Sequence, residues 1–180
     1  MTAARSIAVF GASQSKPGDG HYEEAIRCGE LIALAGFAVA TGGYGGTMEA
    51  VSKGAQSMGG HVIGVTAPDV FATRSGANEH VTVEAPADSL IERIGYLVDE
   101  TVASLALWGS LGTATELLVA WNLAYVAPFA DRERKPVAAV GEPWLTLIPH
   151  LEETLDTTSG LVHVSVTVDS AVDHIVSALS

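Results

Sequence analysis

Glu116 follows a glycine-containing segment, Gly109-Ser-Leu-Gly-Thr113, that could bind an anion next to a sugar. Glycines let a backbone approach an anion closely, and the first turn of a helix offers unpaired N–H groups at the positive end of its dipole. Glu116 would repel a phosphate if it pointed the same way, so we expect it to face a sugar. A purely steric explanation stays open, because many strand-to-helix turns carry glycine.

The residues on either side of this segment predict a buried strand and then an amphipathic helix. Residues 101–108 form a short apolar run with a β-branched start, which is typical of a parallel strand. The apolar residues that follow recur at helical spacing: Leu117, Leu118, Trp121 and Tyr125. We expect Trp121, Tyr125 and a long apolar stripe to be exposed and part of it to form a dimer interface, with ordinary core packing as the alternative.

Two further glycine segments follow predicted strands. Gly11-Ala-Ser13 follows the run 6–10, and Gly42–Gly46 follows the run 37–41. The carboxyl ends of parallel strands share one edge of a sheet, so we expect all the glycine segments to line that edge. The predicted residues for binding a phosphate or nucleotide are Gly11, Ser13, Gly42, Gly43, Gly46, Thr47, Gly109, Ser110, Gly112 and Thr113. Thr47 and Thr113 could equally be simple helix caps, and Ser13 could only shape its turn.

The rest of the chain alternates between strand and helix patterns. The expected helices are 21–35, 47–55, 86–100 (with Pro86 in the first turn), 143–155 and 169–179 (with Asp169 or Ser170 as N-cap). The other expected strands are 61–66, 79–84, 135–140 and 161–168, and residues 67–78 form a loop at the ligand edge. This alternation predicts an α/β fold in one domain, residues 1–180, with a parallel sheet of about six or seven strands covered on both faces.

Composition excludes several classes of function. The net charge of −12 argues against binding long nucleic acids, which normally requires a basic face. A membrane helix needs about 18 uninterrupted apolar residues, and none of this length is present. The single cysteine, Cys28, indicates a reducing compartment, and the first residues lack the apolar core of a signal peptide. We therefore expect a cytoplasmic protein that binds neither nucleic acid nor membrane.

Cofactor motifs are missing from the glycine segments. None matches the dinucleotide fingerprint G-x-G-x-x-G after the first strand or the phosphate loop G-x-x-x-x-G-K-[ST], so we expect a mononucleotide-like ligand. The six histidines lack metal-ligand spacing, and we expect no metal site. Pyridoxal phosphate would require a lysine, but Lys16, Lys53 and Lys135 all lie outside the glycine segments. We expect no cofactor.

Four motifs resemble the LONELY GUY family, much of which was labelled lysine decarboxylase-like. They are Val9-Phe-Gly-Ala-Ser13, Thr41-Gly-Gly-Tyr-Gly-Gly-Thr-Met48, Ile91-Glu-Arg-Ile94 and Gly109-Ser-Leu-Gly-Thr-Ala-Thr-Glu116, and the similarity spans residues 6–140. The resemblance implies a Rossmann-like three-layer sandwich, a homodimer or higher homo-oligomer, and hydrolysis of nucleoside 5′-monophosphates. The implied substrates are AMP-like or cytokinin riboside monophosphates, and the products are free base and ribose 5-phosphate.

The resemblance also assigns the catalytic pair. Gly109, Gly112, Thr113 and Glu116 match the family signature P-G-G-x-G-T-x-x-E, and Arg93 matches an arginine on the preceding helix. The departures from the family pattern are Trp108 for proline, Ser110 for glycine, Thr115 for glutamate, and Ile91 and Ile94 for histidine and lysine. A small hydroxyl residue such as Thr115 also occurs in the related molybdenum-cofactor carrier proteins, which bind their ligand without cleaving it.

The predicted chemistry depends on a carboxylate near the sugar. Cleavage of an N-glycosidic bond builds positive charge on the ribose, which Glu116 could stabilise while Arg93 holds it or binds the phosphate or sugar. The structural alternatives are a solvated Glu116, a surface salt bridge of Arg93, and an exposed Tyr44 instead of one stacked on a base. Three hypotheses follow: a phosphoribohydrolase, a non-catalytic carrier of a nucleotide or pterin cofactor, and, less favoured, a nucleotide sensor.

Overall fold

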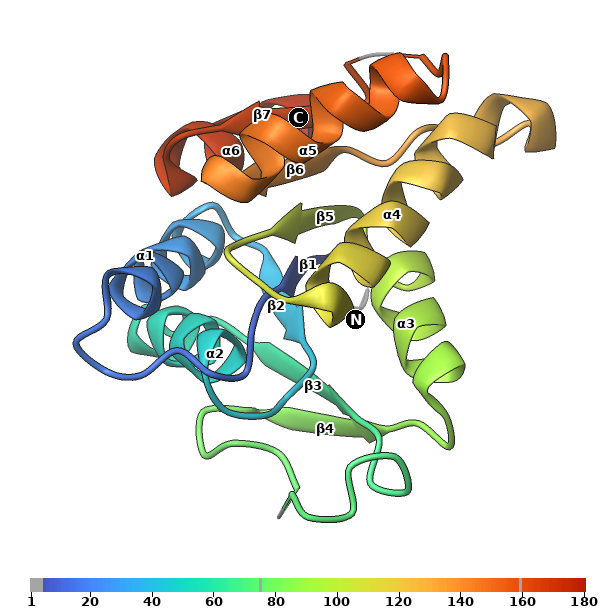
Figure 1. Cartoon of the computed structure of the whole chain (residues 1–180). Helices are drawn as coiled ribbons and strands as arrows, with labels where there is room; N and C mark the ends of the chain where they lie inside the picture. Colours follow the sequence, from blue (N-terminus) through green and yellow to red (C-terminus); the bar gives the residue numbers. More distant parts are fainter. Residues whose placement is uncertain (1–4, 75, 159) are drawn as a thin grey trace.

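The computed structural model describes residues 5–74, 76–158 and 160–180 and contains one parallel sheet flanked by helices (Figure 1). The strands are β1 (Ser6–Phe10), β2 (Ala38–Thr41), β3 (Val62–Thr66), β4 (Val83–Pro86), β5 (Ala103–Ala106), β6 (Val137–Val140) and β7 (Val162–Ser165). The helices are α1 (Gly20–Leu34), α2 (Thr47–Ser57), α3 (Leu90–Asp99), α4 (Leu111–Val126), α5 (Glu142–Thr154), α6 (Val168–Leu179) and the short 3-10 helix η1 (Ala127–Ala130). The predicted Rossmann-like α/β fold is confirmed. Among the described residues, no helix has the length and hydropathy to cross a bilayer.

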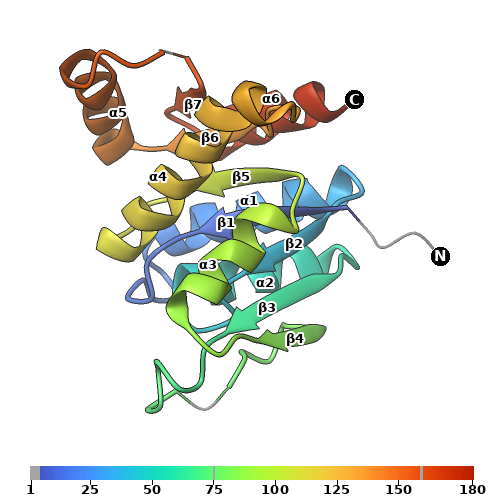
Figure 2. The same ribbon diagram turned by 90° about the vertical axis from the view of Figure 1, so that its right-hand side faces the viewer.

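Two hydrophobic cores separate the three layers. Helices α1, α2 and α6 cover one face of the sheet, and α3, α4 and α5 cover the other (Figure 2). Side chains of β1 alternate between them: Ile7 and Val9 enter the first core, and Ala8 and Phe10 enter the second. Strands β1, β2 and β5 each contribute apolar side chains to both cores, so the centre of the sheet is buried on both faces, as parallel sheets require.

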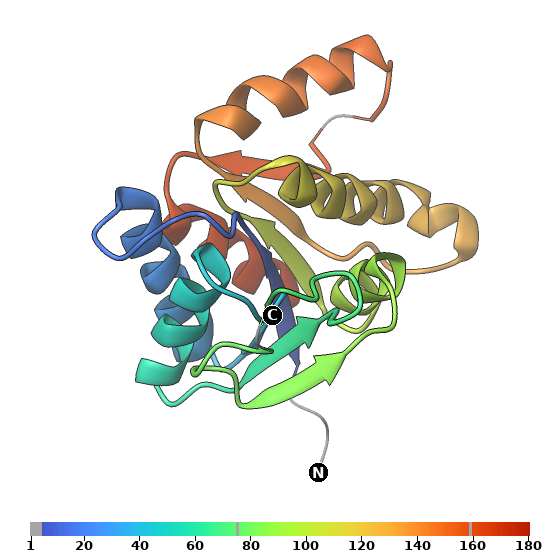
Figure 3. The same ribbon diagram turned by 60° about the horizontal axis from the view of Figure 1, so that its bottom comes forward.

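The strand order indicates which edge of the sheet would bind a ligand. The order β4-β3-β2-β1-β5-β6-β7 reverses direction between β1 and β5, which are paired in parallel through Val9 and Leu105. Ligands of open α/β sheets bind beyond the carboxyl ends of the strands at such a reversal. The long connection between β3 and β4 leaves from the same edge (Figure 3).

Several element boundaries differ from the prediction. The strand expected at 79–84 begins at Val83, and Pro86 ends it instead of opening the next helix. This placement is possible because β4 is an edge strand, where proline leaves no ladder partner unsatisfied. Helix α3 begins after Ser89, whose hydroxyl accepts a hydrogen bond from the Glu92 N–H.

Helix α6 is capped two residues before the first of its two expected N-cap residues. Its N-cap is Thr167, whose hydroxyl accepts from the Ser170 N–H, so neither Asp169 nor Ser170 is the cap.

Helix α4 begins at Leu111, although the glycine pattern predicted a loop up to Thr113. Ser110 has the extended backbone of an N-cap residue, which lets the helix start directly after it.

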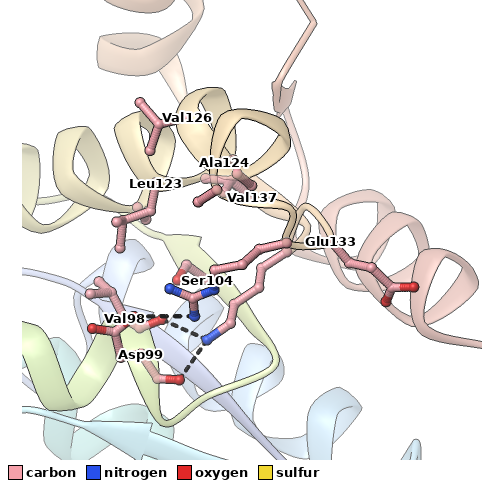
Figure 4. A pocket seen from close by; sticks show the side chains of 13 residues that line it. Val98, Asp99, Ser104, Leu123, Ala124, Val126, Glu133 and Val137 are labelled. Atoms are coloured by element: carbon pink, nitrogen blue, oxygen red, sulfur yellow. Dashed lines mark hydrogen bonds and ion pairs between the residues drawn. The ribbon is translucent and has the colours of Figure 1, made fainter.

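Basic side chains occupy the opposite edge of the sheet, where helices end. Lys135 Nζ donates to the carbonyl oxygens of Val98 and Asp99 at the end of α3, at 3.0 and 2.6 Å (Figure 4). Arg134 donates in the same way to a carbonyl near the end of α4, and Arg5 to one near the end of α6. Cations stabilise the negative ends of helix dipoles, so these residues support the fold.

Replacing Lys135 with methionine should lower the free energy of unfolding by about 1 kcal/mol, because two carbonyl groups lose a charged donor. Urea denaturation measures this change. Lys53→Met is the matched control, since Lys53 is exposed on α2 and should be close to neutral. Equal effects of the two substitutions would contradict a capping role for Lys135.

Candidate functional site

The loops after β1, β2 and β5 are joined at the reversal of strand order. The Ala12 N–H donates to the Trp108 carbonyl at 3.2 Å, and the Thr47 N–H donates to the Ala12 carbonyl at 2.9 Å. Gly11 permits this approach, because a Cβ there would overlap the side chain of Thr47. The three glycine segments therefore meet at one edge, as predicted.

Arg93 and Glu116 form a buried ion pair beneath these loops. Nη1 of Arg93 lies 3.3 Å from Oε1 of Glu116, and Nε donates to the Val65 carbonyl at 2.8 Å. The two residues are only 7% and 8% exposed. Two of the structural alternatives, a solvated Glu116 and a surface salt bridge of Arg93, are therefore wrong.

Gly42 provides the space for the Arg93 guanidinium. A Cβ at position 42 would overlap Nη2 of Arg93, so any larger residue would displace it. Nη2 also lies 3.8 Å from the sulfur of Met48. The ion pair thus depends on the loop after β2 as well as on α3 and α4.

Burial shifts the pKa of both partners. Desolvation raises the pKa of Glu116 from 4.5 to about 7, and the Arg93 charge opposes this shift. Burial likewise lowers the pKa of Arg93, with the Glu116 charge acting in the opposite direction. Near neutral pH the carboxyl group can thus exist in either state, which suits a group that exchanges protons or stabilises charge.

An open cleft of about 120 Å³ lies above the pair. Its walls are Val9, Phe10, Gly11, Ser13, Gly42, Met48, Phe71, Arg74, Arg93, Ser110, Gly112, Thr113 and Glu116. Eight of the residues predicted from the sequence are therefore brought together here: Gly11, Ser13, Gly42, Arg93, Ser110, Gly112, Thr113 and Glu116.

The other predicted residues lie outside this lining and support the loops: Gly43, Gly46, Thr47 and Gly109. Gly43 and Gly46 have positive φ angles of 77° and 74°, which favour glycine. The Thr47 hydroxyl is buried and lies 2.8 Å from the Ser15 hydroxyl. Gly109 leaves room for the Thr113 side chain. Thr47 and Thr113 sit inside the first turns of α2 and α4, so neither is the N-cap.

The first turn of α4 contains no acidic side chain that would neutralise the positive end of the helix dipole. The other five α-helices each carry an acidic residue in the first turn, namely Glu23, Glu49, Glu92, Glu142 and Asp169, but α4 carries none. The Ser110 side chain makes no capping hydrogen bond to α4. The N–H groups of this first turn are therefore available to an anion in the cleft.

Sequence reasoning missed Arg74 on the loop between β3 and β4. Its guanidinium carbon lies 4.5 Å from the ring centres of both Tyr44 and Phe71, and Nη2 lies 3.4 Å from the Ser13 hydroxyl. The signal was available, because residues 67–78 were already expected at this edge.

Tyr44 is neither exposed nor free to stack on a base: it is buried, and its hydroxyl accepts from the Ala67 N–H at 2.8 Å.

Comparison with known proteins identifies the family. The model of the SLOG cluster4 family matches residues 4–159. The chain belongs to the SLOG cluster4 family. It is 31% identical to the cytokinin riboside 5′-monophosphate phosphoribohydrolase of Mycobacterium tuberculosis over 68% of its length, and this match spans 63% of that relative. The predicted relation to LONELY GUY proteins is confirmed.

Solved structures show a second kind of relative of this SLOG protein. The molybdenum cofactor binding protein of Rippkaea orientalis superposes with a TM-score of 0.78 at 22% identity, covering 100% of both chains, and shows the shared fold. The molybdenum cofactor carrier protein of Chlamydomonas reinhardtii has a TM-score of 0.75 at 25% identity, covering 98% of this chain and 99% of its own.

The pH dependence of stability should report the burial of Glu116. Its raised pKa means that its stabilisation is complete below pH 4.5 and is lost as the pH rises through about 7. The free energy of unfolding should therefore fall from about pH 5 to about pH 8 in the wild type relative to Glu116→Gln. Chemical denaturation at each pH measures the difference, and Glu153→Gln, at an exposed position of α5, should keep the wild-type profile.

Gly42→Ala should lower the affinity for any ligand that contacts Arg93, because the new methyl group displaces the guanidinium from Glu116. Gly45→Ala is the matched control in the same loop, since its Cβ would meet only a Glu49 oxygen at 3.6 Å. Calorimetric titration with AMP should show a loss of at least about tenfold for Gly42→Ala alone. Similar affinities of the two variants would count against this geometry.

Proposed function

We propose that this protein hydrolyses the N-glycosidic bond of nucleoside 5′-monophosphates of the AMP or cytokinin riboside type. The products are the free base and ribose 5-phosphate. The observation that carries the proposal is the buried ion pair of Arg93 and Glu116, which lies in one cleft with the acid-free amino terminus of α4. The named relative from Mycobacterium tuberculosis supports the same reaction.

The phosphate group is assigned to the amino terminus of α4. N–H groups of Gly112 and Thr113 belong to its first turn, and both residues line the cleft. Across the cleft, Arg74 and the Ser13 hydroxyl add a cation and a polar partner. Together they form a site that favours a dianion over the uncharged end of a nucleoside.

Glu116 acts on the ribose. The bond between C1′ and the base nitrogen breaks with its electrons moving to the base, and C1′ gains positive charge. The ionised Glu116 carboxylate stabilises this charge or orients the attacking water, whose hydroxyl bonds to C1′ while its proton leaves toward the base. Arg93 holds the carboxylate in place. Since the carboxylate form is needed, the rate should increase as the pH rises through about 7.

A carrier of a nucleotide or molybdenum cofactor is the second candidate. The whole-chain similarity to the Chlamydomonas reinhardtii carrier supports it, as does Thr115, where hydrolases of the LONELY GUY family have glutamate. The same cleft would then bind its ligand without cleaving it.

Incubation with AMP and isopentenyl-AMP, followed by chromatography of the free base, separates the two candidates. Hydrolysis should release adenine or isopentenyladenine, and both Glu116→Gln and Arg93→Ala should reduce the rate at least about a hundredfold. Arg27→Gln is the control, since Arg27 pairs with Asp169, neither residue lines the cleft, and the variant should keep the wild-type rate. Tight binding of AMP without any released base would reject the hydrolase and favour the carrier.

The proposal includes a homodimer formed through α4. Leu111, Leu118 and Tyr125 repeat every seven residues on one helix face and are 83%, 41% and 36% exposed. Phe129 on η1 extends this apolar surface and is 82% exposed. Trp121, expected on the same surface, is instead buried in the core at 5% exposure, because it packs against the sheet.

Leu118→Glu should convert the dimer to a monomer, because it places a charge in the apolar surface. Light scattering coupled to size-exclusion chromatography measures the mass. Leu34→Glu, at a residue of α1 that is 66% exposed, is the control and should leave the mass unchanged. A monomeric wild type would contradict the dimer without affecting the assignment of Glu116.

A further inference from the structure

A second cleft of about 480 Å³ lies on the other side of the loop between β5 and α4. Its walls come from α1, the two residues after β5, the end of β6, the start of α5 and the residue after β7: His21, Glu24, Leu107, Trp108, Val140, Gly141, Glu142, Pro143, Leu145 and Val166. None of these residues lines the cleft above Arg93 and Glu116. Its volume is within the range of sites for small organic ligands.

One wall of this second cleft is a stack of two aromatic rings. The Trp108 indole and the His21 imidazole have their centres 4.8 Å apart and are parallel within 3°. Aliphatic side chains complete the lining, and one of them, Val166, is 71% exposed. Flat rings next to aliphatic groups form a slot that suits another planar ring.

The formal charges in the lining of this slot are acidic, whereas the first cleft is lined by Arg74 and Arg93 together with Glu116. Glu24 and Glu142 line the slot, and its lining contains neither lysine nor arginine. Glu142 also occupies the first turn of α5, so the positive end of this helix is already matched by a carboxylate. An anionic ligand is therefore disfavoured, whereas a ligand with amino or ring N–H donors finds two acceptors.

We propose that this slot binds a planar nitrogen heterocycle that carries an amino group and no negative charge, such as a purine or pterin ring. The ring stacks on the pair formed by Trp108 and His21, and its amino group donates to the Glu142 carboxylate, because Glu24 is already paired with His21 at 3.6 Å. The inference stands on this cleft alone and does not depend on hydrolysis in the first one.

Nuclear magnetic resonance with adenine as the probe tests the proposal. The chain contains three tryptophans, and Trp121 and Trp144 are buried at 5% and 3% exposure, so labelled indole N–H groups give a small set of signals. Trp108→Phe identifies the signal of Trp108. Adenine should shift this signal saturably, whereas benzoate, an anionic ring, and ribose 5-phosphate should leave it in place.

Variants measured by calorimetry with adenine complete the test. Trp108→Ala should weaken binding at least about tenfold, as expected for a lost stacking partner. Glu142→Gln should weaken it about tenfold through one hydrogen bond to a charged acceptor, and Glu153→Gln on the same helix should have no effect. Unchanged affinity in Trp108→Ala, or loss of the Trp108 shift in Arg93→Ala, would overturn the proposal, because the ring would then bind elsewhere.

Discussion

The burial of two opposite charges between α3 and α4 is the constraint on which the ligand edge depends. Removing Arg93 and Glu116 from water is costly, and their attraction offsets this cost only with good geometry and further hydrogen bonds. The Val65 carbonyl supplies one of these bonds, and Gly42 keeps the space open. Residues of β3, α3, α4 and the loop after β2 must therefore be placed together before the pair can exist.

Five of the nine basic residues of this acidic chain fall into two groups. Arg5, Arg134 and Lys135 stabilise helix ends at the edge opposite the ligand cleft, whereas Arg74 and Arg93 face the cleft itself. Acidic residues follow the complementary pattern, since they open every α-helix of the described chain except α4. The cleft next to α4 therefore holds two arginines although the protein has a net charge of −12.

Local patterns predicted the alternation of strands and helices and the meeting of the glycine segments at one edge of the sheet, because periodicity and glycine segments are properties of neighbouring residues. Contacts between residues that lie far apart in the sequence were harder to predict from it. Arg74 reaches the cleft through a long loop, and Tyr44 is buried by its hydrogen bond to the Ala67 N–H. Trp121 was expected at the surface because helical spacing shows which residues share a face but not how wide the buried face is. The start of α4 was misplaced for a related reason: glycine at position 112 suggested a loop, yet it lies within the first turn.

The protonation of Glu116 tests the buried ion pair most directly. Carbon-13 labelling of glutamate side chains, with Glu116→Gln to assign the signal, allows its carboxyl group to be titrated. We expect a pKa of about 7 in the wild type and a higher value in Arg93→Gln, because the arginine charge holds the pKa down. A pKa near 4.5 that does not respond to the loss of Arg93 would show that the carboxylate is solvated and unpaired, and would contradict the site described here.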